Sequence, residues 1–402
     1  MLQHALEHEA CSRNIDKHML TDIHRPYQEC VACVMDTSDP DITFDDAGVC
    51  NHCHGFESFW RPRWFPNAEG ARKLEAMLEK ARAEGKGKDY DCIIGLSGGV
   101  DSSYLALKVK EFNLRPLVVH VDCGWNSELA VHNIEQIVKY CGYDLHTHVV
   151  DWEEVKDLQL AFLRSGVANQ DVPQDHAFFA ALYGTAIKHG IKTVISGGNI
   201  ATESIFPKNW LGDNMDKRNL RAIHQRFGTG KLRSYPMVGF FNYYIGYPFL
   251  HGMRVLRPLN YMPYDKRAAV RELVEKVGYK EYGRKHGESV FTKFFQNYYL
   301  PTRFGMDKRR PHYASLIVSG QISRAEAVQA LAEPLYDERE LDQDMDYFCK
   351  KLSLTRPEFE ALLNVEKHDW RDYPNNEKLY LTLKKLQGLV QRMLGRGVTI
   401  YS

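Results

Sequence analysis

The segment Leu96-Ser-Gly-Gly-Val-Asp-Ser-Ser103 constrains the fold most, because it stands between a short apolar run and a predicted helix. The first backbone N–H groups of a helix lack intrahelical partners and carry the positive end of the helix dipole. Glycines let the backbone close around an anion, and serine hydroxyls add donors. The segment therefore predicts a phosphate-binding loop. It is not a Walker loop, because no Gly-Lys-Ser/Thr follows at the required spacing.

Strands and helices alternate from Tyr90 onward. Strands are predicted over 91–96, 116–121, 145–150 and 192–196, and helices over about 101–112, 127–141, 153–164 and 174–189. Such alternation predicts right-handed βαβ units and an α/β fold with a parallel sheet. Residues 201–255 are interpreted as an aromatic insertion. Further helices are predicted over 266–277, 324–332, 338–352 and 377–394, and a capping box at Thr355 and Glu358 begins another.

The 402-residue length predicts two or three domains. We expect an N-terminal extension (1–25), a four-cysteine element (26–60), a helix over 68–84 with a linker (61–89), a nucleotide domain with the aromatic insertion (90–264) and a helical C-terminal region (265–402). Lys and Arg together number 52, as do Asp and Glu, so the whole chain is not predicted to bind nucleic acid electrostatically.

No membrane span is predicted. The longest stretch without charged residues in the middle of the chain, 234–253, contains two prolines, three glycines, Asn242 and His251. The N-terminus has no basic region followed by an apolar run, so no signal peptide is predicted and we expect a cytoplasmic protein. In that compartment the nine cysteines are expected to be ligands or buried thiols.

Two Cys-x-x-Cys pairs, Cys30/Cys33 and Cys50/Cys53, are separated by sixteen residues. Two such pairs can converge on one tetrahedral Zn²⁺ with four thiolate ligands. A structural zinc ribbon is the favoured interpretation; an iron–sulfur cluster or a redox pair is the alternative. Five aspartates and no Lys or Arg lie between Cys30 and Cys53, which argues against a ribbon that grips RNA.

The loop resembles the pyrophosphate loop of the ATP-pyrophosphatase (PP-loop) superfamily, which includes NAD synthetase, GMP synthetase, asparagine synthetase and tRNA thiolation enzymes. The resemblance implies a Rossmann-like adenine-nucleotide alpha-hydrolase sheet, and ATP cleaved to AMP and pyrophosphate with Mg²⁺. Asp101 is expected to help to organise the Mg²⁺. The predicted nucleotide-binding residues are Leu96, Ser97, Gly98, Gly99, Asp101, Ser102 and Ser103, with Val119, His120 and Asp122 after the second strand and Gly197, Gly198 and Asn199 after the fourth.

Two stretches are strongly basic. Residues 217–233 hold six Lys/Arg and no acids, and residues 284–310 hold seven against two acids, with aromatic residues between them. A solvated surface is one interpretation of each. The other is a site for a second anionic substrate beside ATP, for which Lys293 and Arg303 are the candidate phosphate contacts.

A sharper resemblance covers residues 27–390. The segments 30–53, 94–102 and 293–310 are similar to those of N-acetyl sugar amidotransferases, which belong to lipopolysaccharide O-antigen and flagellar sugar pathways. The resemblance implies that ATP and Mg²⁺ are used to convert an acetamido group of a nucleotide-activated sugar into an acetamidino group. It also implies a separate glutaminase that supplies ammonia and a cyclase-like partner. In this interpretation Asp101 and Lys293 are the candidate catalytic residues.

Two other functions remain open at this stage. A tRNA sulfurtransferase would need a reactive cysteine near the α-phosphate, and Cys123 is the candidate. A non-catalytic ATP-binding module with a zinc ribbon is the third possibility. For an amidotransferase, we expect ammonia to come from a partner, because neither kind of glutaminase cysteine is found in the chain. A class II glutaminase needs a cysteine at its mature N-terminus, but Leu2 follows Met1. A class I glutaminase has a nucleophilic cysteine usually flanked by glycines, whereas Cys123 and Cys141 have glycine on one side only. The aromatic segment 235–249 and the acidic helix start 337–346 are the candidate partner surfaces, and burial in the core is the other interpretation of the aromatic segment.

Overall fold

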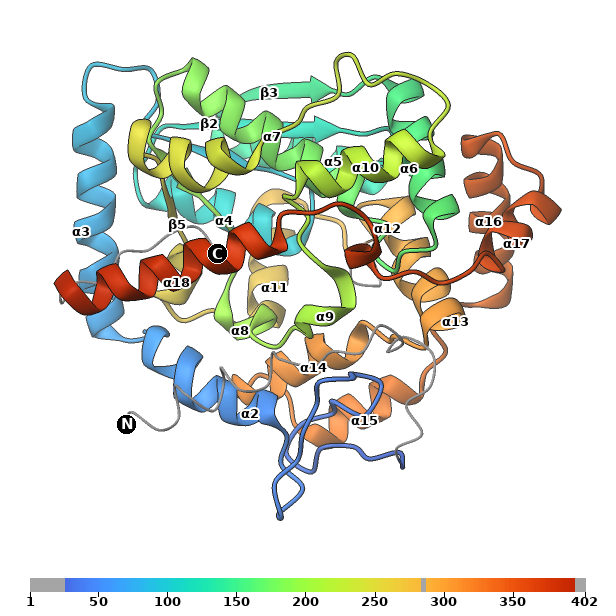
Figure 1. Ribbon diagram of the computed structural model, residues 1–402. Coiled ribbons are helices and arrows are strands. Elements are labelled where there is room, and N and C mark those ends of the chain that lie inside the picture. Colours follow the sequence, from blue (N-terminus) through green and yellow to red (C-terminus); the bar gives the residue numbers. More distant parts are fainter. Residues whose placement is uncertain (1–25, 283–286, 395–402) are drawn as a thin grey trace.

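A computed structural model describes residues 26–282 and 287–394, so the predicted N-terminal extension lies outside the described residues. Its centre is a five-stranded sheet (Figure 1). The strands are β1 (Cys92–Gly95), β2 (Pro116–Asp122), β3 (Asp144–Val149), β4 (Thr193–Ile195) and β5 (Arg254–Leu256). They lie in the order β3-β2-β1-β4-β5, and every neighbouring pair is parallel. The predicted parallel α/β sheet is confirmed.

The fifth strand was not predicted. β5 has three residues and lies inside the stretch interpreted as part of the aromatic insertion, and it pairs with β4 through Thr193 and Arg254. A run this short carries too little pattern to identify a strand from sequence alone. Its pairing partner, 61 residues earlier in the chain, is what makes it a strand.

Helices cover both faces of the sheet. The first set comprises α3 (Ala68–Gly85), α4 (Val100–Glu111), α5 (Glu128–Cys141) and α11 (Lys266–Val277). Their apolar side chains form one buried cluster with Ile94, Val118 and Ile195 of the sheet. On the other face α7 (Val172–Lys188) and the π-helix η3 (Asn242–Leu250) pack against Ile93 and Val119. Alternate residues of β1, β2 and β4 therefore supply two cores.

Helix ends agree closely with sequence signals. Ser127 caps α5 by accepting a hydrogen bond from the Ala130 N–H, and Gly142 ends that helix with a φ of 71°. The predicted bounds of α11, α15 (Arg324–Ala332), α16 (Glu338–Leu352) and α18 (Glu377–Leu394) match the structure. The remaining α-helices are α2 (Asn51–Gly55), α6 (Trp152–Ser165), α8 (Ile200–Glu203), α9 (Lys208–Leu211), α10 (Lys217–Phe227), α12 (Val290–Phe294), α13 (Leu300–Phe304), α14 (Arg309–Val318) and α17 (Arg356–Leu363). Short π and 3₁₀ segments are η1 (Phe56–Trp60), η2 (Arg61–Arg63), η4 (Pro258–Asn260), η5 (Phe295–Tyr299) and η6 (Trp370–Asp372).

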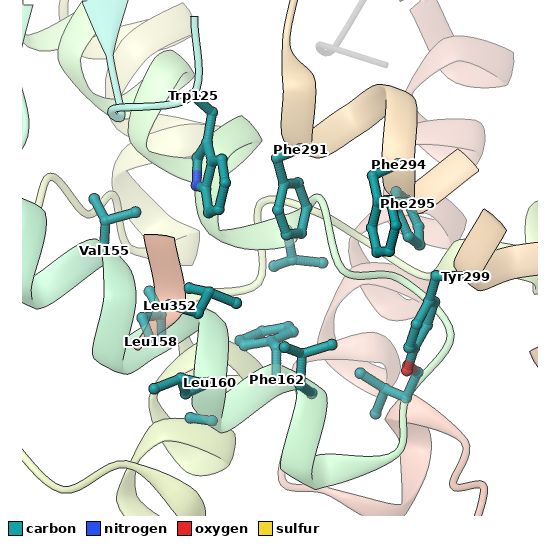
Figure 2. Packing of buried hydrophobic residues seen from close by; sticks show 14 of the residues in the cluster. Trp125, Val155, Leu158, Leu160, Phe162, Phe291, Phe294, Phe295, Tyr299 and Leu352 are labelled. Atoms are coloured by element: carbon teal, nitrogen blue, oxygen red, sulfur yellow. The ribbon is translucent and has the colours of Figure 1, made fainter. Parts of the chain in front are cut away.

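The largest buried cluster joins the nucleotide domain to the C-terminal helices. Figure 2 shows Trp125, which follows β2, beside Phe291 of α12, with Leu158 and Phe162 of α6 on the other side of the cluster. The Trp125 and Phe291 rings lie 5.2 Å apart between centroids. Because aromatic side chains bury large areas, this cluster fixes α12 against the end of β2.

The four-cysteine element packs on α14 and α15 (Figure 1). The Arg324 guanidinium donates to the carbonyl of Cys33 at 2.8 Å and to that of Cys30 at 3.2 Å. Arg310 donates to the Val34 carbonyl at 2.8 Å and pairs with Glu29 and Asp36. These bonds attach the element to the C-terminal region, and it also contacts residues after β4: Asn209 donates to Asp41, and Ile205 belongs to the same buried cluster. Among the described residues no helix is both long and apolar enough to cross a membrane.

Candidate functional site

The predicted phosphate loop joins β1 to α4. Ser97 Oγ lies 3.2 Å from Ser102 Oγ and accepts from the Gly99 N–H at 3.3 Å, while Ser102 Oγ donates to the Gly99 carbonyl at 3.0 Å. Gly99 is the N-cap of α4. The first N–H groups of a twelve-residue helix and two serine hydroxyls are thus gathered at one place.

Gly98 gives the loop its curvature. Its φ is +85°, and a Cβ there would meet the Ala130 carbonyl oxygen at 2.8 Å. The Gly98 carbonyl accepts from the hydroxyls of Tyr279, at 3.1 Å, and Tyr282, at 2.7 Å. These two donors fix the orientation of the Gly98 carbonyl.

Asp101 lies in the first turn of α4 and is fixed by two donors. The Tyr264 hydroxyl donates to Asp101 Oδ1, and Asn199 Nδ2 donates to the same oxygen at 3.4 Å. Burial and the neighbouring Asp101 carboxylate raise the pKa of Tyr264, so this phenol stays a donor. Within the described ranges no donor reaches Oδ2, an oxygen suited to Mg²⁺.

A cavity of about 890 Å³ opens at the carboxyl edge of the sheet, between the ends of β1 and β4. β1 is joined through α4 to β2 on one side, while β4 lies on its other side, so this is a topological switch point. Phosphate-loop residues line one part of the cavity, and α7 lines another. Ligands of open parallel sheets bind at such positions.

Seven of the predicted nucleotide-binding residues line this cavity: Leu96, Ser97, Gly99, Asp101, Ser102, Gly197 and Gly198. His120 lines it too; its Nδ1 lies 2.9 Å from the Leu96 carbonyl oxygen. These segments are far apart in the sequence, and the parallel sheet brings them together at its carboxyl edge.

Five predicted residues are not among those that line the cavity: Gly98, Ser103, Val119, Asp122 and Asn199. Val119 and Ser103 are fully buried, and Asn199 is 5% exposed. Asp122 Oδ1 accepts from the Gly124 N–H at 2.7 Å and so closes a turn. Val121 lines the cavity instead of Val119, because it lies on the same face of β2 two residues closer to the carboxyl edge where the cavity opens.

Lys293 and Arg303 do not line the cavity either. Lys293 Nζ pairs with Glu340 at 3.1 Å and with Asp344 at 2.5 Å. Arg303 is 6% exposed and donates to the carbonyls of Leu362, Leu363, Val365 and Glu366. The two cationic groups expected to contact a substrate phosphate are bound instead by carboxylates of α16 and by carbonyls at the end of α17 and in the following loop. The basic character of 293–310 serves packing in this arrangement, and none of the residues 217–233 lines the cavity.

Sequence reasoning missed several residues of the cavity. Arg257, directly after β5, and Lys266, at the start of α11, supply its lysine and arginine side chains. Helix α7 supplies Asp171, Gln174 and Asp175, followed by aromatic residues such as Phe178. The Asp171–Asp175 spacing of four residues at a helix start was the available signal, because residues i and i+4 share a face.

Cys123 lines the cavity but is a poor nucleophile. The side chain is 7% exposed. Burial raises the pKa of its thiol to about 12, and the neighbouring carboxylates of Asp122 and Asp175 add to the shift. Because the thiolate is the nucleophilic form, this environment disfavours sulfur transfer through Cys123.

The four cysteines of the N-terminal element converge. Cys30, Cys33, Cys50 and Cys53 are all buried, and their sulfur atoms lie within 4.8 Å of one another. Measured pairs are 3.9 Å for Cys30–Cys53, and 3.7 Å for both Cys33–Cys50 and Cys50–Cys53. Four sulfurs about 2.3 Å from one tetrahedral Zn²⁺ stand roughly 3.8 Å apart, so this donor set fits the metal.

The C-terminal region has a known relative. Residues 288–387 match the family described as "LPS biosynthesis protein WbpG-like, C-terminal domain". This segment is similar to that domain. The match confirms the expected link to lipopolysaccharide biosynthesis proteins for these residues. The WbpG-like segment (residues 288–387) contains Thr292 and Gln296, which line the cavity together with the phosphate loop. No curated protein sequence matches the chain.

Several solved structures are similar at low identity. NMN synthetase from Francisella tularensis is 14% identical over 71% of this chain and 96% of its own, with a TM-score of 0.33. NAD+ synthetase from Burkholderia pseudomallei is 19% identical over 55% and 94%, with a TM-score of 0.28. NH3-dependent NAD synthetase from Campylobacter jejuni is 14% identical over 39% and 72%, with a TM-score of 0.26.

Proposed function

We propose that this chain is an ATP-dependent amidotransferase that adenylates the acetamido group of a nucleotide-activated sugar and replaces its oxygen with ammonia. The products are an acetamidino sugar for lipopolysaccharide O-antigen or another surface glycan, AMP and pyrophosphate. The supporting observation is a single cavity lined both by the phosphate loop and by the WbpG-like segment. ATP and the second substrate would then meet where residues of both parts converge.

The loop suits attack on the α-phosphorus of ATP. Helix α4 directs its first N–H groups at the anion site, and Ser97 and Ser102 add hydroxyl donors. Arg257 and Lys266 face the same cavity and can neutralise charge on the leaving pyrophosphate. Mg²⁺, when bound at Asp101, supplies further charge neutralisation. The protein orients the reactants and stabilises developing charge.

Zn²⁺ in the four-cysteine site has a structural role in this proposal. Four thiolates complete a tetrahedral shell and leave no open position for substrate. The element contacts α14, and α14 packs on α8. The Ser315 hydroxyl of α14 accepts from the N–H of Ile205, two residues after α8, at 2.9 Å. Because α8 begins directly after Gly198 and Asn199, the metal site supports one wall of the cavity at a distance.

Ammonia is proposed to come from a separate glutaminase subunit, and a cyclase-like subunit is the expected second partner. Free ammonia is scarce near neutral pH, and a synthetase of this kind draws it from glutamine. The proposed docking surfaces remain the aromatic segment 235–249, where Phe241 and Phe249 are exposed, and the acidic start of α16.

The experiment uses the purified chain with ATP, Mg²⁺ and a panel of acetamido nucleotide sugars. We expect sugar-dependent formation of AMP and pyrophosphate when ammonium chloride is the nitrogen source. With glutamine in place of ammonium the chain alone should form no product. Addition of the glutaminase partner should make glutamine a usable nitrogen source. Formation of ADP and phosphate would contradict adenylation. Glutamine-dependent turnover by the pure chain would contradict the need for a partner.

A further inference from the structure

The polar end of the cavity has no role in the chemistry described so far. Three elements build it: Asp171, Gln174 and Asp175 from the first turns of α7, Asn126 after β2, and Thr292 and Gln296 from the WbpG-like segment. The next residues of α7 that face the cavity, Phe178, Phe179 and Leu182, are apolar. One helix therefore divides the cavity wall into a polar part and an aromatic part.

Asp171 is held in place by the WbpG-like segment. Thr292 Oγ1 donates to its Oδ1 at 3.1 Å, and Gln296 Nε2 donates to its Oδ2 at 3.4 Å. Both bonds favour the ionised carboxylate, since each donor serves a different oxygen. Asp171 is thus a fixed negative charge at the N-terminus of α7.

Asp175 lies one turn further along α7. Asn214 Nδ2 donates to its Oδ2 at 2.5 Å. The neighbouring charges are the Asp171 carboxylate, which disfavours ionisation of Asp175, and the Lys308 ammonium, which favours it. Burial and Asp171 together raise the pKa of Asp175 from 3.8 to about 7. A carboxyl group in this environment exchanges a proton readily near neutral pH.

A second observation marks this end as a ligand site. The Gln174 Nε2 amide is buried and has no hydrogen-bond partner among the described residues. Gln174 lies between the two aspartates on α7 and lines the same cavity. An unpaired buried donor is costly, so an acceptor on a bound molecule is expected to complete it.

The geometry points to Asp175 as the proton acceptor for the ammonia that attacks the adenylated amide, a role that rests on the proposed function. Asp171 acts as a positioning residue, because its fixed charge keeps the cationic nitrogen near Asp175. The polar end of the cavity is thereby the ammonia site, and the phosphate loop binds ATP elsewhere in the same cavity.

The proton balance requires such a group. The amide oxygen bonds to the α-phosphorus, and pyrophosphate leaves with the electron pair of the broken P–O bond. Ammonia then forms a C–N bond and carries three protons and a positive charge. One proton passes to the Asp175 carboxylate before AMP leaves with the electron pair of the C–O bond, which yields the amidinium product. Asp175 returns that proton to solvent, and released pyrophosphate takes one up.

The test compares Asp175→Asn with wild type in the full chain, with Asp213→Asn as the matched control. Asp213 is a carboxyl group that does not line the cavity, and its Oδ2 accepts from the Tyr244 hydroxyl at 3.1 Å. Adenylation is followed by sugar-dependent exchange of labelled pyrophosphate into ATP, which needs no ammonia. Amidine formation is followed with ammonium chloride and with hydroxylamine, which is a weaker base than ammonia.

We expect Asp175→Asn to keep exchange within threefold and to lose about 10²- to 10⁴-fold in amidine formation with ammonium. The loss with hydroxylamine should be at least tenfold smaller, because the attacking nitrogen then gives up its proton more easily. Asp213→Asn should match wild type in both assays. If Asp175→Asn does not fold, Asp175→Glu should fold and take its place in the test. For each nucleophile the rate of Asp175→Glu is divided by that of wild type, and this ratio should be higher with hydroxylamine than with ammonium.

Three results would overturn the assignment: unchanged amidine formation by Asp175→Asn, an equal loss of exchange and amidine formation, or an equal loss with the two nucleophiles. Failure of wild type to exchange pyrophosphate with any sugar of the panel would instead contradict the proposed function itself, and this assignment with it.

Discussion

Thr292 Oγ1 donates a hydrogen bond to Asp171 Oδ1 at 3.1 Å. Thr292 lies in α12 of the WbpG-like segment, and Asp171 is the N-cap of α7 in the nucleotide domain. The bond joins two parts of the chain 121 residues apart inside the cavity. The C-terminal segment is therefore part of the site and not an appended domain.

Loss of one metal ligand should release the metal and weaken the N-terminal element. Cys30→Ser is expected to reduce bound zinc from one equivalent to well below one, and to lower the free energy of unfolding by at least about 3 kcal/mol, because metal binding and folding are coupled. Metal analysis and urea denaturation measure the two effects. Cys349→Ser, at a buried thiol of α16, should retain the zinc. A wild-type protein without zinc or iron would contradict the site.

Asp101→Asn should separate activity from stability. Asn keeps the oxygen that accepts from Tyr264 and Asn199, so the free energy of unfolding should change by less than about 1 kcal/mol, whereas kcat for AMP formation should fall about 10²- to 10³-fold. The matched control is Asp144→Asn, since Asp144 accepts from the Tyr90 hydroxyl at 2.9 Å in β3, outside the cavity. Equal activity of the two variants would refute the role of Asp101.

Cys123→Ala tests the sulfur-transfer alternative. The thiol pKa of about 12 leaves almost no thiolate at neutral pH, so the amidotransferase reaction should keep kcat within about threefold of wild type. A tRNA sulfurtransferase that uses this cysteine would lose turnover completely. Steady-state assays of AMP formation decide between these outcomes.

The charge of Asp175 should make stability depend on pH. Because its folded pKa is raised from 3.8 to about 7, the folded state binds the proton more tightly than the unfolded state. That contribution is complete below about pH 4 and is lost as the pH rises through 7. Asp175→Asn cannot ionise, so its free energy of unfolding should increase relative to wild type between pH 5 and pH 8. Urea denaturation of both proteins at pH 5 and at pH 8 measures these free energies of unfolding. If the difference between variant and wild type is the same at the two pH values, the raised pKa of Asp175 is contradicted.

Arg303 should prove structural. Its guanidinium donates to carbonyls at the end of α17 and in the following loop, so Arg303→Met leaves those carbonyl groups without this donor. We expect a loss of about 2–4 kcal/mol in the free energy of unfolding and an unchanged KM for the sugar in the folded fraction. Normal stability of Arg303→Met together with a strongly raised KM for the sugar would instead support the prediction that Arg303 contacts a substrate phosphate.

Local signals predicted most of the fold. The apolar runs of β1, β2 and β4 and the caps of α5, α11 and α17 are readable in sequence because each depends on residues a few positions apart. β5 was not readable, since three residues carry no period and pairing with β4 defines the strand. The sixteen-residue spacing between the cysteine pairs likewise indicated a convergent site that the structure shows.

The site was only partly predictable for a similar reason. Ser97, Gly99 and Asp101 belong to one continuous motif, whereas Arg257, Thr292 and Asp175 reach the cavity from three separate elements. Basic composition pointed to Lys293 and Arg303, but charge along the chain does not tell which side chains pair internally. Glu340 and Asp344, which neutralise Lys293, lie some fifty residues later in α16.

The amidotransferase activity is tested most directly by mass spectrometry of acetamido nucleotide sugars after incubation with the purified chain, ATP, Mg²⁺ and ammonium. We expect a product one mass unit lighter than the substrate, since NH replaces O, in equal amount to AMP and pyrophosphate. With ¹⁵N-ammonium the product should be equal in nominal mass to the substrate. An unchanged sugar in the presence of AMP and pyrophosphate formation, or a product that carries no ¹⁵N, would contradict it.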